Sequence, residues 1–140
     1  MVQLRRVLDL ADDGAESPQE TRLRLLLTSA GMRPSHTQIE VYDEYSLIGR
    51  LDMGWPEWKV GVQYDGVQHW TDPRQRARDI DQDLAYRDAG WRIARVGADL
   101  MRYRRPTILR RVRDALNAAG APYPLPKVKK IARIPRILAI

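Results

Sequence analysis

The spacing of apolar residues predicts a helix over residues 17–31. Its leucines recur at helical spacing, a Ser-Pro-x-Glu capping box marks its beginning, and a glycine marks its end. Residues 38–44, 46–55 and 59–66 instead alternate between apolar and polar positions, which is typical of strands. Only a short turn around a proline separates the last two segments, so we expect them to pair as an antiparallel hairpin.

The second half of the chain adds a helix, a strand and a helix. An Asp-Pro pair opens the first of these helices at residue 72, and it ends near residue 90. Its expected apolar face consists of Ala77, Ile80 and Leu84. Residues 91–96 form a short strand, and a helix over residues 106–120 follows. The order α-β-β-β-α-β-α predicts an α/β fold with a mixed sheet of about four strands flanked by helices.

Most of the net positive charge lies at the end of the chain. The 140 residues suit one domain, which we place at 17–120, between an N-terminal helical or linker segment, 1–16, and a basic tail, 121–140. The formal charge is +6, and the tail holds five basic residues and no acid, which leaves +1 for residues 1–120. These basic residues are Lys127, Lys129, Lys130, Arg133 and Arg136. Such a tail favours a polyanion such as DNA as its partner, and a solvated terminus is the alternative interpretation.

The composition also excludes several classes of function. The chain has no cysteine, which excludes disulfides, thiolate catalysis and cysteine-ligated zinc. Its apolar runs are too short to cross a bilayer, and the N-terminus lacks the apolar segment of a signal peptide. We therefore expect a cytoplasmic protein that does not interact with membranes.

Polar side chains gather on the otherwise apolar hairpin. Strand alternation puts Gln63 and Asp65 on one face of the second strand. On the first strand it places Leu51 and Met53 together, on the face opposite Asp52. The short turn places Asp52 roughly opposite residue 62 or 63, with Cβ atoms about 5 Å apart. Two carboxylates and an amide oxygen at this distance suit a hard cation such as Mg²⁺ or Mn²⁺.

His69 follows the hairpin and is suited to act as a general acid or base near neutral pH. Each candidate also has a purely structural explanation. Asp52 can be a surface acid, Asp65 part of a turn, His69 a structural residue, and Glu20 the acid of the capping box. Their expected convergence on adjacent strands favours the functional interpretation.

These residues belong to a set of short motifs that occur in a fixed order. They read SPQE (17–20), RLD (50–52), QYDGVQH (63–69), RARD (76–79) and GWRIAR (90–95). Over about residues 15–119 this ordered set resembles the very-short-patch-repair-endonuclease-like family of the PD-(D/E)XK nuclease superfamily. Within it, the chain is most similar to a group of uncharacterised actinobacterial proteins.

The resemblance implies a restriction-endonuclease-like fold and divalent-metal-dependent hydrolysis of phosphodiester bonds in DNA or another nucleic acid. Carried over by position, Asp52 is the first metal-binding aspartate, Asp65 and His69 belong to the D-G-x-x-H motif, and Glu20 is the first-helix glutamate. Asp79 matches a helix aspartate of the family.

Gln63 departs from the family pattern, because it replaces the glutamate that usually precedes Y-D-G. Its amide oxygen can still bind a metal ion but supplies no negative charge. The alternative function is therefore a nuclease-fold module that binds nucleic acid or a partner protein without cleaving. Phosphate contacts are expected from Arg74 and Arg76 and from the basic tail. A homodimer, or a partner protein bound through the tail, is the remaining expectation.

Overall fold

The expected order of helices and strands is confirmed in the computed structural model of the protein. The structure describes residues 16–66, 72–122, 124–125, 132–133 and 137–138. The helices are α2 (Pro18–Ser29), α3 (Pro73–Asp88), α4 (Ala98–Tyr103) and α5 (Arg105–Ala118). The strands are β1 (His36–Tyr42), β2 (Leu47–Trp55), β3 (Val60–Asp65), β4 (Arg92–Gly97), β5 (Ala132–Arg133) and β6 (Ile137–Leu138). The expected helical segment in residues 1–15 lies outside the described residues.

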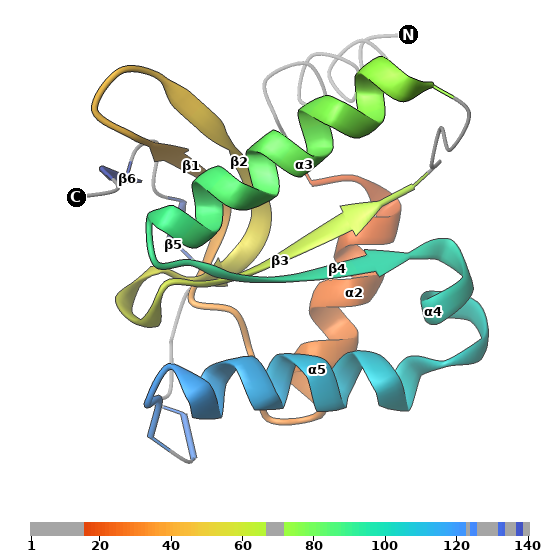
Figure 1. Ribbon diagram of the computed structural model, residues 1–140. Coiled ribbons are helices and arrows are strands. Elements are labelled where there is room, and N and C mark those ends of the chain that lie inside the picture. The colour runs from red at the N-terminus through yellow and green to blue at the C-terminus, as the bar shows by residue number, and fades with distance from the viewer. Residues whose placement is uncertain (1–15, 67–71, 123, 126–131, 134–136, 139–140) are drawn as a thin grey trace, which may run out of the picture.

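The strands form one mixed sheet (Figure 1). Along its main path the order is β4-β3-β2-β1-β5, and β6 also pairs with β1. The β1–β2 and β2–β3 pairs are antiparallel, which confirms the expected hairpin, whereas β3 and β4 run parallel. The short β5 and β6 run parallel to β1, so part of the basic tail extends the sheet instead of leaving the domain.

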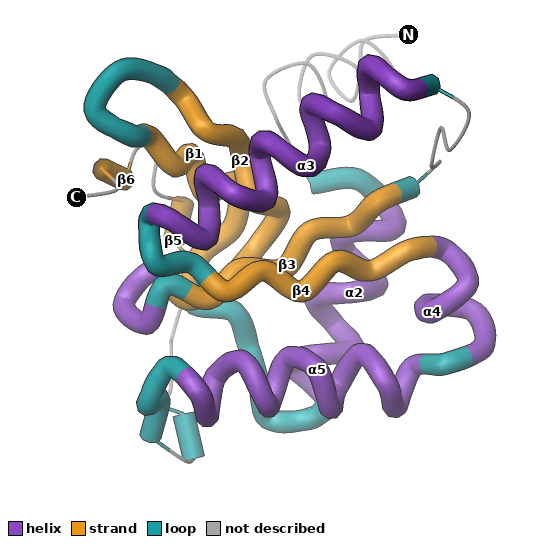
Figure 2. Tube along the Cα trace, viewed as in Figure 1, coloured by secondary structure: helices purple, strands orange, loops and turns teal. Residues whose placement is uncertain are grey.

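Helices cover both faces of the sheet (Figure 2). On one face, α2, α4 and α5 enclose the larger core, in which Leu23, Leu27, Met101 and Leu116 pack against strand residues such as Val62. On the other face, α3 covers a smaller cluster. This cluster consists of Ile39, Val41, Leu51, Tyr86 and Trp91. Because these side chains are almost fully buried, each stabilises the fold by roughly 1.5–3 kcal/mol.

Local signals explain where α2 begins. The Ser17 hydroxyl accepts a hydrogen bond from the backbone N–H of Glu20 at 3.2 Å. In return, the Glu20 carboxylate accepts one from the backbone N–H of Ser17 at 2.9 Å. This capping box satisfies two of the otherwise unpaired N–H groups at the start of the helix. It also fixes the Glu20 side chain at the end of α2 that adjoins the candidate site.

The prediction for the buried face of α3 was wrong. Ile80 and Leu84 are 53% and 48% exposed, and Ala77 is exposed too. Instead, α3 buries Tyr86, and the Gln82 amide donates to the backbone carbonyl of Ile48 at 3.1 Å. The helix therefore packs through a face that holds a hydrogen-bonding amide and a tyrosine, which an apolar count does not detect.

The expected shared face of Leu51 and Met53 was also wrong. Leu51 packs in the cluster under α3, whereas Met53 packs in the core under α2 and α5. The change of face coincides with Gln38, which the β1–β2 register places opposite residue 52 and which has a φ of 54°. A non-glycine residue in this left-handed region interrupts the regular alternation of a strand. The irregularity lies beside Asp52.

Candidate active site

The candidate site begins where β2 and β3 stop pairing. The ladder between them runs from Trp55–Val60 to Met53–Val62. At the next position side-chain oxygens take over: the Tyr64 N–H donates to Asp52 Oδ2 at 2.6 Å, and the Asp52 N–H donates to Gln63 Oε1 at 3.2 Å. These two bonds satisfy backbone groups that the sheet no longer pairs. They also hold Asp52 and Gln63 in contact at the opening between the strands.

Glu20 reaches the same opening from α2. Its carboxyl lies close enough to that of Asp52 to raise the pKa of Asp52, through its charge and through a side-chain hydrogen bond, although the two residues lie on different elements. The buried Gln38 amide donates to Glu20 Oε2 at 3.4 Å, so β1 also helps to hold the glutamate. Asp52 is itself only 7% exposed. The site therefore centres on a pair of carboxyl groups, Asp52 and Glu20, with amide groups around them.

The surroundings of Asp52 oppose its ionisation. Burial raises its pKa to about 8, and the negative charges of Glu20 and Asp65 act in the same direction. The hydrogen bond from the Tyr64 N–H acts the other way and is outweighed. Asp52 therefore keeps its proton at neutral pH unless a positive charge replaces it.

Asp65 lies near this pair but is bound to Arg95. The guanidinium donates to both carboxylate oxygens of Asp65, at 3.1 and 3.3 Å, and also to Asp83 on α3. The register explains the contact, because Arg95 on β4 pairs with Gln63 and lies on the same face of the sheet as Asp65. The ion pair offsets the charge of Asp65, so the described site carries less negative charge than the motif implies.

The other expected site residues divide into those the structure describes and those it does not. Arg74 and Arg76 are exposed in the first turn of α3. Asp79 is exposed on the same helix, where it accepts a hydrogen bond from Gln75 at 2.9 Å. His69 lies outside the described residues, as do Lys127, Lys129, Lys130 and Arg136; only the backbone of Arg133 is described, in β5.

The Asp52–Glu20 pair fits a magnesium-like ion in part. In the ranges that the structure describes, no three His, Cys, Asp or Glu side chains gather closely enough to form a complete metal cage. Mg²⁺ is commonly bound by one or two carboxylates together with waters and substrate phosphates. Two carboxyl groups that repel each other when both are ionised meet that requirement, since a bound cation would relieve the repulsion.

Two residues of this site were missed by sequence reasoning. The apolar alternation predicts an ordinary strand that begins at Gln38. In the structure, the buried amide of Gln38 lies beside Glu20 and belongs to the site. In the sequence, Arg95 stands out only as part of the GWRIAR motif. Its polar side chain within a short apolar strand is the signal that could have assigned it a carboxylate partner.

Comparisons with known proteins leave the family open. The chain is similar to an uncharacterized protein of Mycobacterium tuberculosis, MT2308 in strain CDC 1551 and Rv2248 in strain H37Rv. In each case the identity is 26% over 102 residues, which covers 73% of this chain and 38% of the relative. The chain thus spans less than half the length of these relatives. No family model matches the sequence, and no solved structure matches it.

No helix among the described residues combines the length and apolar character needed to cross a membrane.

Proposed function

We propose that the protein is a divalent-metal-dependent endonuclease that hydrolyses phosphodiester bonds in DNA, with Asp52 and Glu20 as its metal-binding carboxylates. The observation that carries this proposal is the meeting of these two carboxyl groups, from β2 and α2, at the opening between β2 and β3. The order of helices and strands supports it, as does the ordered set of motifs that resembles the PD-(D/E)XK superfamily. Burying two carboxyl groups together is costly unless they share a proton or bind a cation.

The residues of the chain have distinct roles in this proposal. Asp52 and Glu20 would hold the ion, which would supply charge neutralisation, activation of water and stabilisation of the leaving oxygen. The Tyr64 N–H donates to the Asp52 carboxyl, and Gln63 Oε1 accepts from the backbone N–H of Asp52, so both bonds keep Asp52 at the strand opening. Glu20, or His69 after the strand, would orient the attacking water and accept its proton.

A plasmid-nicking assay tests the proposal directly. Purified protein incubated with supercoiled DNA should convert it to the nicked form when Mg²⁺ or Mn²⁺ is present and not when EDTA is added. Asp52→Asn preserves the shape of the side chain and its bond from Tyr64, yet it should abolish nicking. Asp81→Asn removes an exposed carboxyl on α3 and should leave nicking unchanged. Equal activity of wild type and Asp52→Asn would refute the assignment.

A second candidate function follows from the charges around the site. Gln63 is neutral, and the ion pair with Arg95 offsets the charge of Asp65. Both features reduce the attraction for a cation and favour a module that binds nucleic acid without cleaving it. Gln63→Glu separates the two functions, because the carboxylate would add a negative charge beside Asp52. Nicking that arises only in Gln63→Glu identifies the natural chain as a binding module, whereas nicking by the wild type identifies it as an enzyme.

A further inference from the structure

The outer edge of β4 is open in the part of the chain that the structure describes. β4 ends the sheet and pairs only with β3, whereas the opposite end is extended by β5 and β6 (Figure 1). The N–H of Arg92 donates to the carbonyl of Lys59 at 2.9 Å, which shows that the backbone groups of Arg92 and Ala94 point toward β3. By strand alternation, the N–H and C=O groups of Ile93 and Arg95 point outward.

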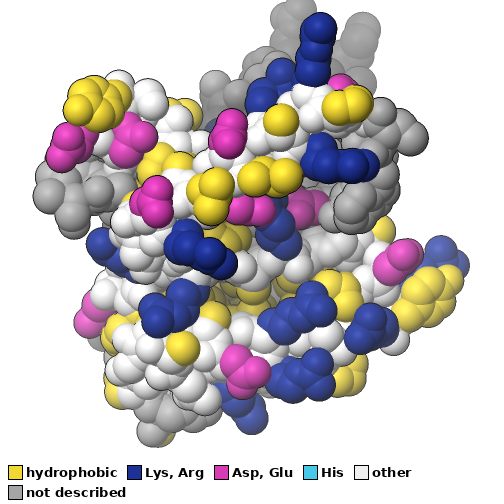
Figure 3. Space-filling view, in the orientation of Figure 1, with side chains coloured by type: hydrophobic (Ala, Val, Ile, Leu, Met, Phe, Trp, Pro, Cys, Tyr) yellow, Lys and Arg dark blue, Asp and Glu magenta, His cyan; other side chains and the backbone are white. Residues whose placement is uncertain are grey.

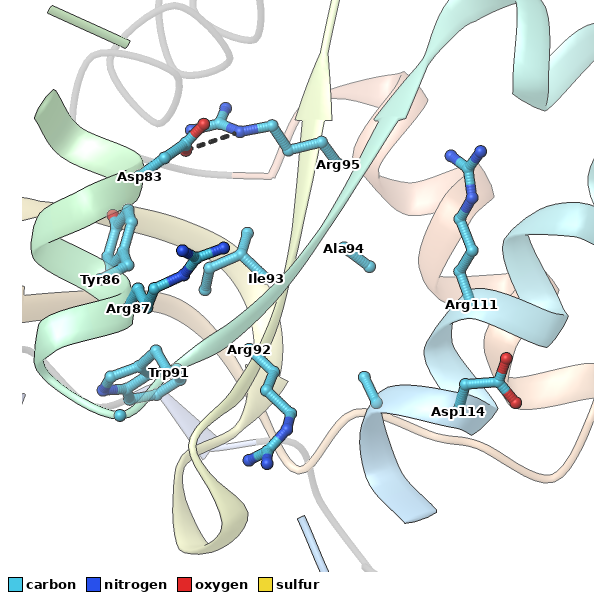
Figure 4. Close-up of a pocket in the computed structure, with 12 residues that line it drawn as sticks. Asp83, Tyr86, Arg87, Trp91, Arg92, Ile93, Ala94, Arg95, Arg111 and Asp114 are labelled. Carbon is cyan, nitrogen blue, oxygen red and sulfur yellow. Dashed lines mark hydrogen bonds and ion pairs between the residues drawn. The ribbon is translucent and has the colours of Figure 1, made fainter. Parts of the chain in front are cut away.

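A groove of about 820 Å³ runs along this edge between α3 and α5. Figure 4 shows Arg87 reaching from α3 toward β4, while Arg111 rises from α5 on the opposite wall. Ile93 lies on the α3 side of the strand, and Ala94 lies on the α5 side. Neither Asp52 nor Glu20 lines the groove, so it is a second site.

The lining of the groove holds four arginines and two aspartates, Asp83 and Asp114, so its net charge is positive. Arg87, Arg92 and Arg111 come from three different elements, and all three are exposed. None of them forms an ion pair with a carboxylate in the described ranges, whereas Arg95 is bound to Asp65 and Asp83. The space-filling view, in the orientation of Figure 1, shows basic side chains over β4 and α5 (Figure 3).

We propose that this groove binds an extended acidic segment of a partner protein, which adds to the sheet as a strand beside β4. The outward N–H and C=O groups of Ile93 and Arg95 supply the backbone hydrogen bonds of strand addition. The six residues of β4 offer roughly 20 Å of edge. Successive side chains of the added strand would point to opposite walls, so adjacent acidic residues would meet Arg87 on one side and Arg111 on the other.

Charge favours this occupant over two others. A second copy of the chain added at the same edge would place Arg87, Arg92 and Arg111 of both copies close together, and like charges across an interface are costly. A nucleic acid would satisfy the arginines but offers no repeating pattern of donors and acceptors for the edge of a strand. An acidic peptide satisfies both features. This inference does not depend on whether the protein hydrolyses DNA.

Fluorescence anisotropy with a defined probe tests the proposal. The probe is a fluorescein-labelled peptide of about ten residues, long enough to cover β4. It consists of Thr and Val with two Glu-Glu pairs. Two matched peptides accompany it: one has every Glu replaced by Gln, and the other is N-methylated at alternate backbone nitrogens, which removes one edge of hydrogen-bond donors.

Protein variants separate the backbone contribution from that of charge. Ile93→Pro removes the outward N–H, and proline is tolerated on edge strands at such positions. Ile93→Thr serves as its control. Arg87→Gln combined with Arg111→Gln removes a cation from each wall, and Arg110→Gln, on α5 outside the groove, is the matched control. The N-methylated peptide tests the same hydrogen bonds on the wild-type protein and so does not depend on the folding of Ile93→Pro.

The expected result is binding of the acidic peptide that weakens about tenfold or more with Ile93→Pro, with the double arginine variant and with either matched peptide. Undiminished binding of the N-methylated peptide, with single-stranded DNA competing equally well, would mean that the groove is a general polyanion surface and would overturn the proposal. Concentration-dependent dimerisation that Ile93→Pro abolishes would also overturn it, because the edge would then bind a second copy.

Discussion

Replacing Asp52 by asparagine should remove a dependence of stability on pH that the buried carboxyl imposes. The amide oxygen of the introduced side chain can still accept the bond from Tyr64, and its N–H groups can donate to Glu20. The side chain keeps its shape but can no longer ionise. The variant therefore isolates the cost of ionising one buried carboxyl group.

The magnitude follows from the shift in the pKa. Burial and the neighbouring carboxylates raise the pKa of Asp52 from 3.8 to about 8. Each pKa unit corresponds to about 1.36 kcal/mol, so the shift represents on the order of 5 kcal/mol. The unfolded chain releases this proton as the pH rises past the ordinary pKa of 3.8. The folded protein retains it until the pH reaches the raised pKa of about 8. The free energy of unfolding of the wild type should therefore fall with rising pH across this window and level off above it.

Urea denaturation at a series of pH values measures this effect. The wild type should lose several kcal/mol of unfolding free energy between about pH 4 and pH 8, and Asp52→Asn should lose much less over the same range. Asp81→Asn, which removes an exposed carboxyl, should follow the wild type. Parallel curves for the wild type and Asp52→Asn would refute the buried, protonated state of Asp52.

Three further predictions concern other parts of the structure. Arg95→Gln releases Asp65 from its ion pair and should tighten Mn²⁺ binding about fivefold, as measured by calorimetry, because a partly exposed pair of this kind contributes roughly 1 kcal/mol. Weaker binding would show that Arg95 orients the site. Gly54→Ala should lower the free energy of unfolding by about 3 kcal/mol, since the added Cβ would overlap the backbone carbonyl of the facing strand. Gly66→Ala is the control and should cost far less, because a Cβ at this position would lie at an ordinary 3.6 Å from its nearest atom. Replacing Lys127, Lys129 and Lys130 by glutamine, which leaves β5 and β6 in place, should weaken DNA binding and reduce the slope of log affinity against log salt by up to about three; an unchanged slope would exclude these lysines from phosphate contacts.

The elements with strong local signals could be predicted from the sequence. The capping box and leucine spacing fixed the beginning and the buried face of α2, and the short proline turn fixed the pairing of β2 with β3. That pairing also placed Asp52 beside Gln63, where the structure has a hydrogen bond between them. Such features depend on residues close together in sequence, so periodicity is sufficient to find them.

Other features depend on contacts between distant elements and could not be read from periodicity. The left-handed conformation of Gln38 moves Leu51 and Met53 to different cores, and no propensity rule places a glutamine in that region. The ion pair between Asp65 and Arg95 could be predicted only if the parallel pairing of β4 with β3 were already known. For α3, Ile80 and Leu84 formed the more apolar stripe, yet hydrogen bonding by Gln82 accompanies the packing of the other face.

The most direct test of the proposed function is an anomalous difference map from a crystal of the protein soaked in Mn²⁺. We predict a peak within coordination distance of both Asp52 and Glu20, at the opening between β2 and β3, and its loss in Asp52→Asn. A map without a peak there, with the Asp52 and Glu20 carboxyls still hydrogen-bonded to each other, would contradict the assignment of this pair as a metal site.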